Sequence, residues 1–186
     1  MSMEIVLVRH GEPVANENKK VTAGGFTHWI QQYNKSFVVS HSSPDKKNIP
    51  NITHHYVVSS PLRRAVHSAK ILTNNVPDEQ LNVLKEMDIP RYKIPLTLKA
   101  WTWVYLCRLL WMCGIKGNFE TFKEAKQRAE LATLSLISMA NNQQKILAVG
   151  HGVMNLYIRK NLKKRGWRLT EKSSKYWGVT RLEKTQ

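Results

Sequence analysis

The sequence predicts an α/β protein with an open, mostly parallel sheet. Two short apolar runs rich in β-branched residues, at 5–8 and 146–149, each end at a glycine-flanked turn, which is typical of buried strands. Strand-like and helix-like segments alternate along the chain, and this order favours parallel strands joined by helices. The 186 residues suit one core, so we expect a single domain over 1–186.

Periodicity and turn residues predict the elements in order. The first half is expected to hold a strand at 4–8, a helix around 25–35, a polar connector at 40–53, a strand at 56–59 and a helix at 61–74. The second half is expected to hold a short strand near 81–84, an apolar helix near 97–113, a helix near 119–140, a strand at 145–149, a helix at 152–164 and a strand from Tyr176 to Leu182. The 119–140 segment is amphipathic, and its core face is predicted from the helical spacing of Phe122, Ala125, Ala129, Ala132, Leu136 and Met139.

The helix after 56–59 begins with two arginines in its first turn. Ser60 is a good N-cap, and Pro61 suits the first helical position, where its missing N–H costs nothing. Cations are disfavoured in the first turn because the helix N-terminus carries partial positive charge. A pair is tolerated there if an anion binds at the helix end, so we expect Arg64 to reach an anion and Arg63 to stay in solvent.

Histidines follow the two apolar runs at corresponding positions. His10 stands in Arg9-His10-Gly11, and His151 stands in Gly150-His151-Gly152. A single histidine near a strand end is more often a hydrogen-bonded structural residue than a functional one. Two of them at the carboxyl edge of a sheet, where open α/β sheets bind ligands, predict a phosphoryl pocket with a nucleophile inside it.

In these segments the chain resembles the histidine phosphatase superfamily, the phosphoglycerate-mutase-like proteins with an Arg-His-Gly motif. The family's motifs are matched in order by Arg9-His10-Gly11, by Arg64 in a Ser-Pro-Leu-x-Arg-Ala-type segment, and by Gly150-His151-Gly152. The match spans residues 4 to about 160. It implies a three-layer α/β/α sandwich with a mostly parallel central sheet, the phosphoglycerate-mutase-like fold.

The resemblance implies a phosphatase that needs no metal and no cofactor. His10 would attack phosphorus and become phosphohistidine, while a backbone carbonyl holds its other ring nitrogen. Arg9, Arg64 and His151, the last as a cation, would hold the transferring group, because phosphoryl transfer depends mostly on positioning and electrostatic stabilisation. The other residues that it implies for substrate contact are Gly11, Asn16 and Gly152.

The resemblance also implies a carboxylate that protonates the leaving oxygen. The family places it in a Leu-x-Glu segment, which Leu84-Lys85-Glu86 matches, so Glu86 is the expected general acid and later the base that activates water. A solvated loop carboxylate is the alternative role for Glu86, and Asp88 is then the alternative acid.

Two departures from the family pattern bear on the substrate. Pro13 stands where serine or threonine is frequent, and residues 87–92 lack the Gly-x-x-Glu-Gly continuation of many members. The chain is also short for the insertions of phosphoglycerate mutases. We therefore expect hydrolysis of a small phosphomonoester rather than mutase activity. The alternative from another class is a non-catalytic protein that keeps the phosphate pocket and binds a polyanion.

The segment 100–113 is unusually apolar and contains three of the six tryptophans, with Arg108 interrupting it. It is too short to span a membrane. Core packing is the favoured role; a dimer contact, an interfacial membrane contact or a lid over the site are the alternatives, and we expect a lid or insert region around 85–117. Cys107 and Cys113 lack metal-ligand spacing and are expected to be buried thiols.

Positive charge dominates the composition, with 29 Lys and Arg against 13 Asp and Glu. Ten basic residues lie between Arg159 and Lys184, where the acidic residues are Glu171 and Glu183. We expect this charge to attract anionic substrates by long-range steering, with nucleic acid or an anionic membrane as alternative partners and a homodimer as a further possibility. The start of the chain shows no signal-peptide pattern, so we expect a cytoplasmic protein.

Overall fold

A computed structural model describes residues 2–45, 52 and 54–185. In this part of the chain a central sheet has six strands in the order β4-β3-β6-β1-β8-β7. The parallel members are β1 (Ser2–Arg9), β3 (Tyr56–Ser59), β4 (Glu79–Gln80) and β6 (Lys145–Gly150). At one edge β8 (Val179–Thr185) and β7 (Arg168–Lys172) run antiparallel. The predicted mostly parallel α/β sheet is therefore confirmed.

Strand register determines which residues leave the sheet together. β1 and β6 pair in parallel, with Arg9 opposite Gly150. β3 lies on the other side of β6, with Ser59 opposite Val149. The residues that follow these three strands therefore emerge at one carboxyl edge of the sheet, as expected for His10 and His151.

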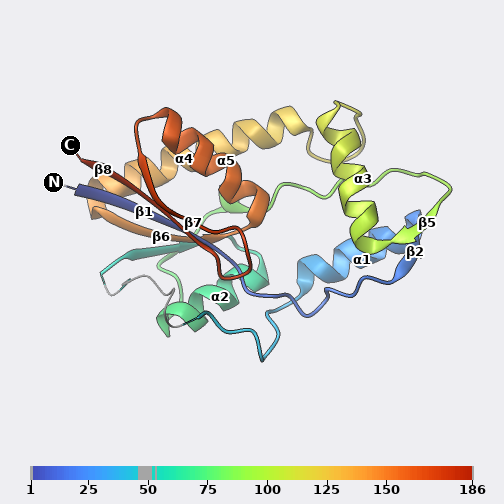
Figure 1. Cartoon of the computed structure of the whole chain (residues 1–186), viewed down its shortest axis with the longest axis horizontal. Helices are drawn as coiled ribbons and strands as arrows, with labels where there is room; N and C mark the ends of the chain where they lie inside the picture. The colour runs from blue at the N-terminus through green and yellow to red at the C-terminus, as the bar shows by residue number, and fades with distance from the viewer. Residues whose placement is uncertain (1, 46–51, 53, 186) are drawn as a thin grey trace.

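Helices cover both faces of the sheet and complete the three-layer sandwich (Figure 1). On one face α2 (Arg63–Thr73) packs on Val6 and Val8 through Ala69. On the other, α4 (Phe122–Gln143) and α5 (Gly152–Lys164) pack on Ile5 and Leu7. Alternate residues of β1 thus face opposite layers, and all four are at most 1% exposed.

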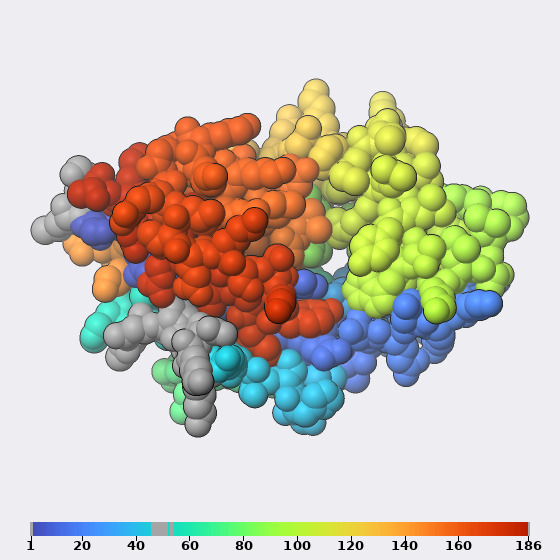
Figure 2. All heavy atoms as spheres, viewed as in Figure 1, coloured from blue at the N-terminus to red at the C-terminus, as the bar shows by residue number. Residues whose placement is uncertain are grey.

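A second group of elements lies beside the sheet. It contains β2 (Lys20–Thr22), α1 (Ala23–Lys35), β5 (Thr97–Lys99) and α3 (Ala100–Met112), and β2 pairs with β5. Aromatic residues form its own core, with Phe26 stacked on both Trp29 and Trp103. The expected lid or insert region around 85–117 contains β5 and α3, and its role as a lid stays a prediction. Figure 2 shows a hollow between this group and the C-terminal residues.

Several sequence predictions are wrong in detail. The segment 81–84 is not a strand: Asn82–Leu84 form a 3-10 helix after the two-residue β4. The final strand begins at Val179 rather than Tyr176, because residues 173–178 form the turn that follows the unpredicted β7. Cys107 is buried, but Cys113 is exposed because it ends α3.

The start of α2 also differs from the prediction. The helix begins at Arg63, its N-cap is Leu62, and no side chain caps it. Ser60 is not the N-cap because the helix begins three residues after it, and its hydroxyl contacts His151 and accepts from the Leu62 amide at 3.3 Å. Part of the predicted connector at 40–53 lies outside the described residues, and within the described residues no helix has the length and apolar character needed to cross a membrane.

Candidate active site

His10 lies just beyond β1 with a defined tautomer. Its Nδ1 is 2.7 Å from the carbonyl oxygen of Gly11, and since a carbonyl only accepts, Nδ1 carries the proton. The Nε2 atom therefore holds a lone pair, and Arg64 Nε donates to it at 3.2 Å. Burial, followed by the charges of Arg64 and Arg9, lowers the pKa of His10 to about 3. His10 is thus neutral, with an unprotonated Nε2 that faces Arg64.

Arg64 is the buried member of the arginine pair. Its Nη1 donates to the carbonyl oxygen of Tyr33 at 3.1 Å, and its guanidinium lies over the Tyr33 ring. The Ser68 hydroxyl donates to the Arg64 carbonyl and accepts from the Gly11 amide, which ties α2 to the turn after β1. Arg63 is exposed, as expected. The structure therefore fixes the guanidinium of Arg64 beside His10.

His151 lies against His10, with ring centroids 5.0 Å apart in an edge-to-face arrangement. Its Nε2 is 2.8 Å from the Ser60 hydroxyl. Its Nδ1 is buried and has no hydrogen-bond partner among the described residues. Burial, with the charges of Arg64, His10 and Arg9, holds the pKa of His151 well below its usual range. His151 is therefore neutral in this structure, which differs from the expected cation.

Arg9 lies at the rim of the site beside the turn between β7 and β8. Its guanidinium stands over the Tyr176 ring at 4.3 Å, and its Nη1 donates to the Ser174 carbonyl at 2.8 Å. Its Nε is buried and lacks a partner in the part of the chain that the structure describes. Arg9 thus keeps an unused donor near the two histidines.

Tyr176 covers the histidines from the same turn. Its ring centroid is 5.8 Å from that of His10, and its side chain hydrogen-bonds with Tyr33. The next residue, Trp177, has a left-handed backbone (φ 59°), and its ring fills the space beside Gly11, where a Cβ would lie 2.4 Å from it. Gly11 is therefore required by the packing of Trp177, and its contact with a substrate stays a prediction.

Glu86 lies between the histidine site and the start of α5. Its Oε1 accepts from the amides of Met87 at 3.0 Å and Met154 at 3.1 Å. The second bond satisfies one of the free N–H groups in the first turn of α5, whose N-cap residue is His151. Both hydrogen bonds fall on one oxygen, so the carboxylate is held in place with its other oxygen available.

Arg128 on α4 holds the segment that carries Glu86. It donates to the carbonyls of Val83 and Lys85 through Nη1 and to that of Glu86 through Nη2. Glu120 fixes the same guanidinium through two short hydrogen bonds, of 2.7 and 2.6 Å. Asp88 lies apart from this arrangement: it is exposed and faces the Glu120 amide at the start of α4.

The remaining predicted contacts lie at the edge of the site. Gly152 follows His151, and a Cβ there would lie 3.4 Å from Arg9 Nε. Asn16 donates through Nδ2 to Glu12 at 3.1 Å, and its buried Oδ1 has no partner among the described residues. Within those residues no group of three His, Cys, Asp or Glu side chains could hold a metal ion.

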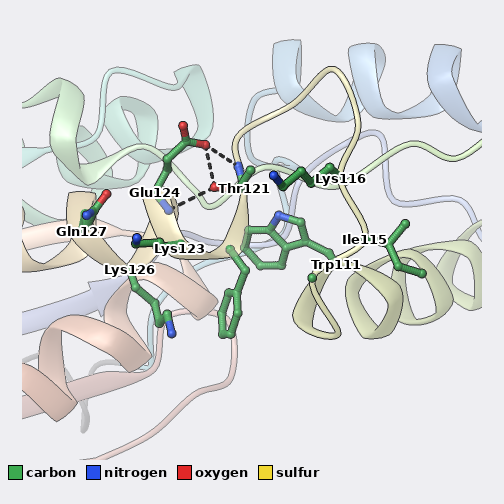
Figure 3. A pocket seen from close by; sticks show the side chains of 10 residues that line it. Trp111, Ile115, Lys116, Thr121, Lys123, Glu124, Lys126 and Gln127 are labelled. Atoms are coloured by element: carbon green, nitrogen blue, oxygen red, sulfur yellow. Dashed lines mark hydrogen bonds between the residues drawn. The ribbon is translucent and has the colours of Figure 1, made fainter.

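Two adjoining cavities meet at Arg9, Gly152 and Ser174. One, of about 300 Å³, extends toward α3 and includes Glu86, and the other, of about 260 Å³, extends toward Arg159 and Lys172. The first corresponds to the hollow between the C-terminal residues and α3 in Figure 2. A separate hollow between the end of α3 and the start of α4 contains Trp111 and several lysines, together with the Thr121–Glu124 capping box of α4 (Figure 3). None of the predicted site residues lines it.

Sequence reasoning missed four residues of this site. They are Tyr33, Ser60 as a partner of His151, Arg128 and Tyr176. Three are held by tertiary packing and carry no local motif. Ser60 belongs to the Ser-Pro-Leu-x-Arg-Ala-type segment that contains Arg64, so the sequence already indicated a polar side chain near the site.

Comparisons with known proteins identify the family and the fold. The family model of the histidine phosphatase superfamily (branch 1) matches residues 46–184. Comparison with curated proteins finds no match. A phosphoglycerate mutase from Bacillus anthracis aligns with a TM-score of 0.63 at 14% identity, over 98% of this chain and 88% of that one.

Two solved phosphatase structures are also similar. A mycobacterial glucosyl-3-phosphoglycerate phosphatase aligns with a TM-score of 0.60 at 16% identity, over 98% of this chain and 91% of that one. An alpha-ribazole phosphatase from Shigella flexneri aligns with a TM-score of 0.56 at 19% identity, over 97% and 95%. At these identities the likeness shows the fold.

Proposed function

Because the chain belongs to the histidine phosphatase superfamily, we propose that it hydrolyses a small phosphomonoester through a phosphohistidine on His10, without a metal ion. The observation that carries this proposal is a neutral His10 whose Nε2 lone pair stands among buried nitrogens without a partner in the described residues. These are the donor Arg9 Nε and the ring nitrogen His151 Nδ1, and Arg64 Nε donates to the same lone pair. Buried donors without partners are rare in folded proteins, and an incoming phosphoryl group would satisfy them.

In the first step His10 Nε2 attacks phosphorus. The nitrogen–phosphorus bond forms as the bond from phosphorus to the leaving oxygen breaks, and the electron pair of that bond goes to the leaving oxygen. The acid form of Glu86 gives its proton to this oxygen, and the alcohol departs. Arg9, Arg64 and His151 stabilise the charge on the three equatorial oxygens.

In the second step the Glu86 carboxylate takes a proton from water. The water oxygen attacks phosphorus, the nitrogen–phosphorus bond breaks, and its electron pair returns to His10 Nε2. Inorganic phosphate leaves. The Nδ1–H bond to the Gly11 carbonyl persists throughout and keeps the ring in one tautomer and orientation.

Hydrolysis is favoured over mutase activity by the region after Glu86. Residues 87–92 lack the Gly-x-x-Glu-Gly continuation, and the residue of this stretch that lines the cavity with Glu86 is the apolar Ile89. A non-catalytic protein that binds a polyanion is the competing hypothesis, and turnover separates the two.

The test is turnover of p-nitrophenyl phosphate and a panel of phosphorylated metabolites in the presence of EDTA. We expect wild-type turnover, an acid-labile phosphohistidine trapped by rapid quench, and neither in a folded His10→Ala variant. His28→Ala, which removes an exposed histidine on α1, is the matched control and should remain active. Substantial activity in His10→Ala would contradict the nucleophile assignment, and phosphate binding without turnover in the wild type would favour the non-catalytic alternative.

A further inference from the structure

We propose that the leaving group of the substrate is an aromatic alcohol carrying a carboxylate, bound in the cavity toward α3 with the carboxylate on Arg108. This inference rests on the proposed function, because it uses the positions of the phosphoryl site and of the proposed acid. It assigns a role to the apolar segment 100–113 and to the single arginine that interrupts it.

The position of Glu86 determines which cavity takes the leaving group. Both cavities reach Arg9 and Gly152, but Glu86 lines the one toward α3 and not the one toward Arg159. An acid that protonates the leaving oxygen has to lie within hydrogen-bond reach of it. The alcohol therefore occupies the cavity that contains Glu86.

The walls of this cavity suit an aromatic ring. Three aromatic side chains line it, those of Tyr33, Trp101 and Tyr105. Trp101 stands edge-on to Tyr33 at 6.0 Å, so these two walls support one another. Aliphatic side chains complete the lining, namely Ile89, Val104 and Val153. The volume of about 300 Å³ fits a small ligand, and aromatic rings pack well against aromatic walls.

Arg108 gives this apolar cavity a defined positive charge. Its Nη2 donates to the carbonyl of Met87 at 3.2 Å, which fixes the guanidinium plane next to the segment that follows Glu86. Its Nη1 is buried and has no hydrogen-bond partner among the described residues. A guanidinium with an unused donor matches a planar carboxylate. Arg9, the other arginine of the lining, belongs to the phosphoryl site.

The experiment compares esters that differ by one group at a time. The aromatic pair is carboxyphenyl phosphate and carbamoylphenyl phosphate, each as the 3- and 4-isomer, and the non-aromatic pair is 3-phosphoglycerate and glycerol 3-phosphate. We expect kcat/KM to be highest for a carboxyphenyl ester. Against its carbamoyl partner the preference should be about 10- to 100-fold, the range expected when a charged hydrogen bond is lost.

Arg108→Met should abolish this preference by lowering kcat/KM for the carboxyphenyl ester about 10- to 100-fold, while the carbamoylphenyl ester changes little. The matched control is Arg159→Met, which removes an arginine from the neighbouring cavity and should leave the preference intact. Loss of the preference in Arg159→Met instead would place the carboxylate in that neighbouring cavity and overturn the proposal.

Tyr105→Ala tests the aromatic wall at a side chain that is 71% exposed, so folding is not at risk. It should lower kcat/KM for the aryl esters about three- to tenfold and leave glycerol 3-phosphate unchanged. Leu109→Ala, one turn further along α3 and outside the cavity lining, is the control and should have no effect.

The outcomes separate this inference from the proposed function. If no ester is hydrolysed, including p-nitrophenyl phosphate, the proposed phosphatase activity is wrong. If p-nitrophenyl phosphate is hydrolysed but the carboxyphenyl and carbamoylphenyl esters react alike, or 3-phosphoglycerate reacts best, the phosphatase proposal stands and this inference fails.

Discussion

At the residue scale, two neutral imidazoles and two arginine side chains meet in one site. Arg64 can stand beside His10 at 3.2 Å because the imidazole is uncharged and accepts its hydrogen bond. A cationic imidazole at that position would face a fixed guanidinium in a region of low dielectric constant. The two neutral imidazoles therefore let two arginines stand in one site, which suits the phosphoryl dianion of the proposed reaction.

Removal of either charge-stabilising group should slow the reaction. Arg64→Ala and His151→Ala are each expected to lower kcat about 10²- to 10³-fold, the usual cost of one pre-organised donor, and to weaken vanadate binding measured by calorimetry. Arg63→Ala removes the exposed neighbour of Arg64 in the same helical turn and serves as the control. Unchanged vanadate affinity in both test variants would remove Arg64 and His151 from the phosphoryl site.

The acid is tested by the nature of the leaving group. Glu86→Gln should slow esters of high-pKa alcohols about 10²- to 10⁴-fold in single-turnover experiments, because their leaving oxygen needs a proton, and should slow p-nitrophenyl phosphate much less. Single turnover is needed because Glu86 also activates water in the second step. Asp88→Asn, at the exposed carboxylate facing Glu120, should behave as wild type. Equal losses for both ester types in Glu86→Gln would argue against the assignment.

At the element scale, the sequence predicted the strands and helices that bury apolar residues. β1, β6, α2 and α5 are close to the expected ranges because their periodicity reflects packing on both faces of one sheet. The charged strand Arg168–Lys172 was missed, since an edge strand needs no apolar alternation. β2 was missed and Thr97–Lys99 of β5 were wrongly included in the helix near 97–113, because three residues carry too short a pattern and their pairing joins segments far apart in the chain.

The site was predictable to the extent that it follows strand ends. Motifs at the ends of predicted strands, or at the start of a predicted helix, identified His10, His151 and Arg64. Packing between elements far apart in the chain brings Tyr33 and Tyr176 to the site, and no motif marks it. The charge of His151 could not be predicted, because it depends on complete burial next to three basic side chains. Local sequence specifies which groups reach the edge of the sheet, and tertiary packing specifies their protonation.

Arg128 links α4 to the function of the 83–86 segment. Arg128→Met should lower the free energy of unfolding by about 2–3 kcal/mol, because three carbonyls and Glu120 lose a charged partner. It should also reproduce the leaving-group dependence of Glu86→Gln while vanadate affinity stays unchanged, which a purely structural role would not produce.

Lys123→Met, at an exposed position one turn earlier on the same helix, is the control for this effect. A destabilised Arg128→Met variant that loses activity equally on all esters would limit Arg128 to folding. Chemical denaturation and single-turnover kinetics on the same preparations decide between the two results.

At the scale of the whole molecule, the folded state keeps two histidines neutral at a pH where they would be protonated in the unfolded chain. In the unfolded state their pKa is about 6.5, whereas His10 binds a proton only near pH 3 and His151 also titrates well below its usual range. Above pH 7 both states hold neutral histidines and stability is complete. Below pH 6.5 the unfolded state binds more protons, so stability falls as pH falls, by about 1.4 kcal/mol per pH unit for each histidine.

This dependence can be measured by urea unfolding between pH 4 and 8. The free energy of unfolding of the wild type should decline steadily below pH 6.5, and a folded His151→Asn variant should decline less steeply. The matched control is His28→Asn, which removes an exposed histidine and should leave the slope unchanged. Parallel slopes for the wild type and His151→Asn would show that His151 is protonated equally in both states.

The place of β1 in the sheet has a consequence for how the protein folds. β1 lies between β6 and β8, so Ser2–Arg9 pairs in the sheet with residues 145–150 and 179–185. The chain therefore has a high contact order, which predicts folding on a scale of about milliseconds to seconds. During synthesis the apolar run Ile5–Val8 stays unpaired until β6 and β8 have left the ribosome. In that interval it can aggregate or bind a chaperone. In the proposed mechanism, His10 can therefore act as a nucleophile only after β1 has paired with both strands.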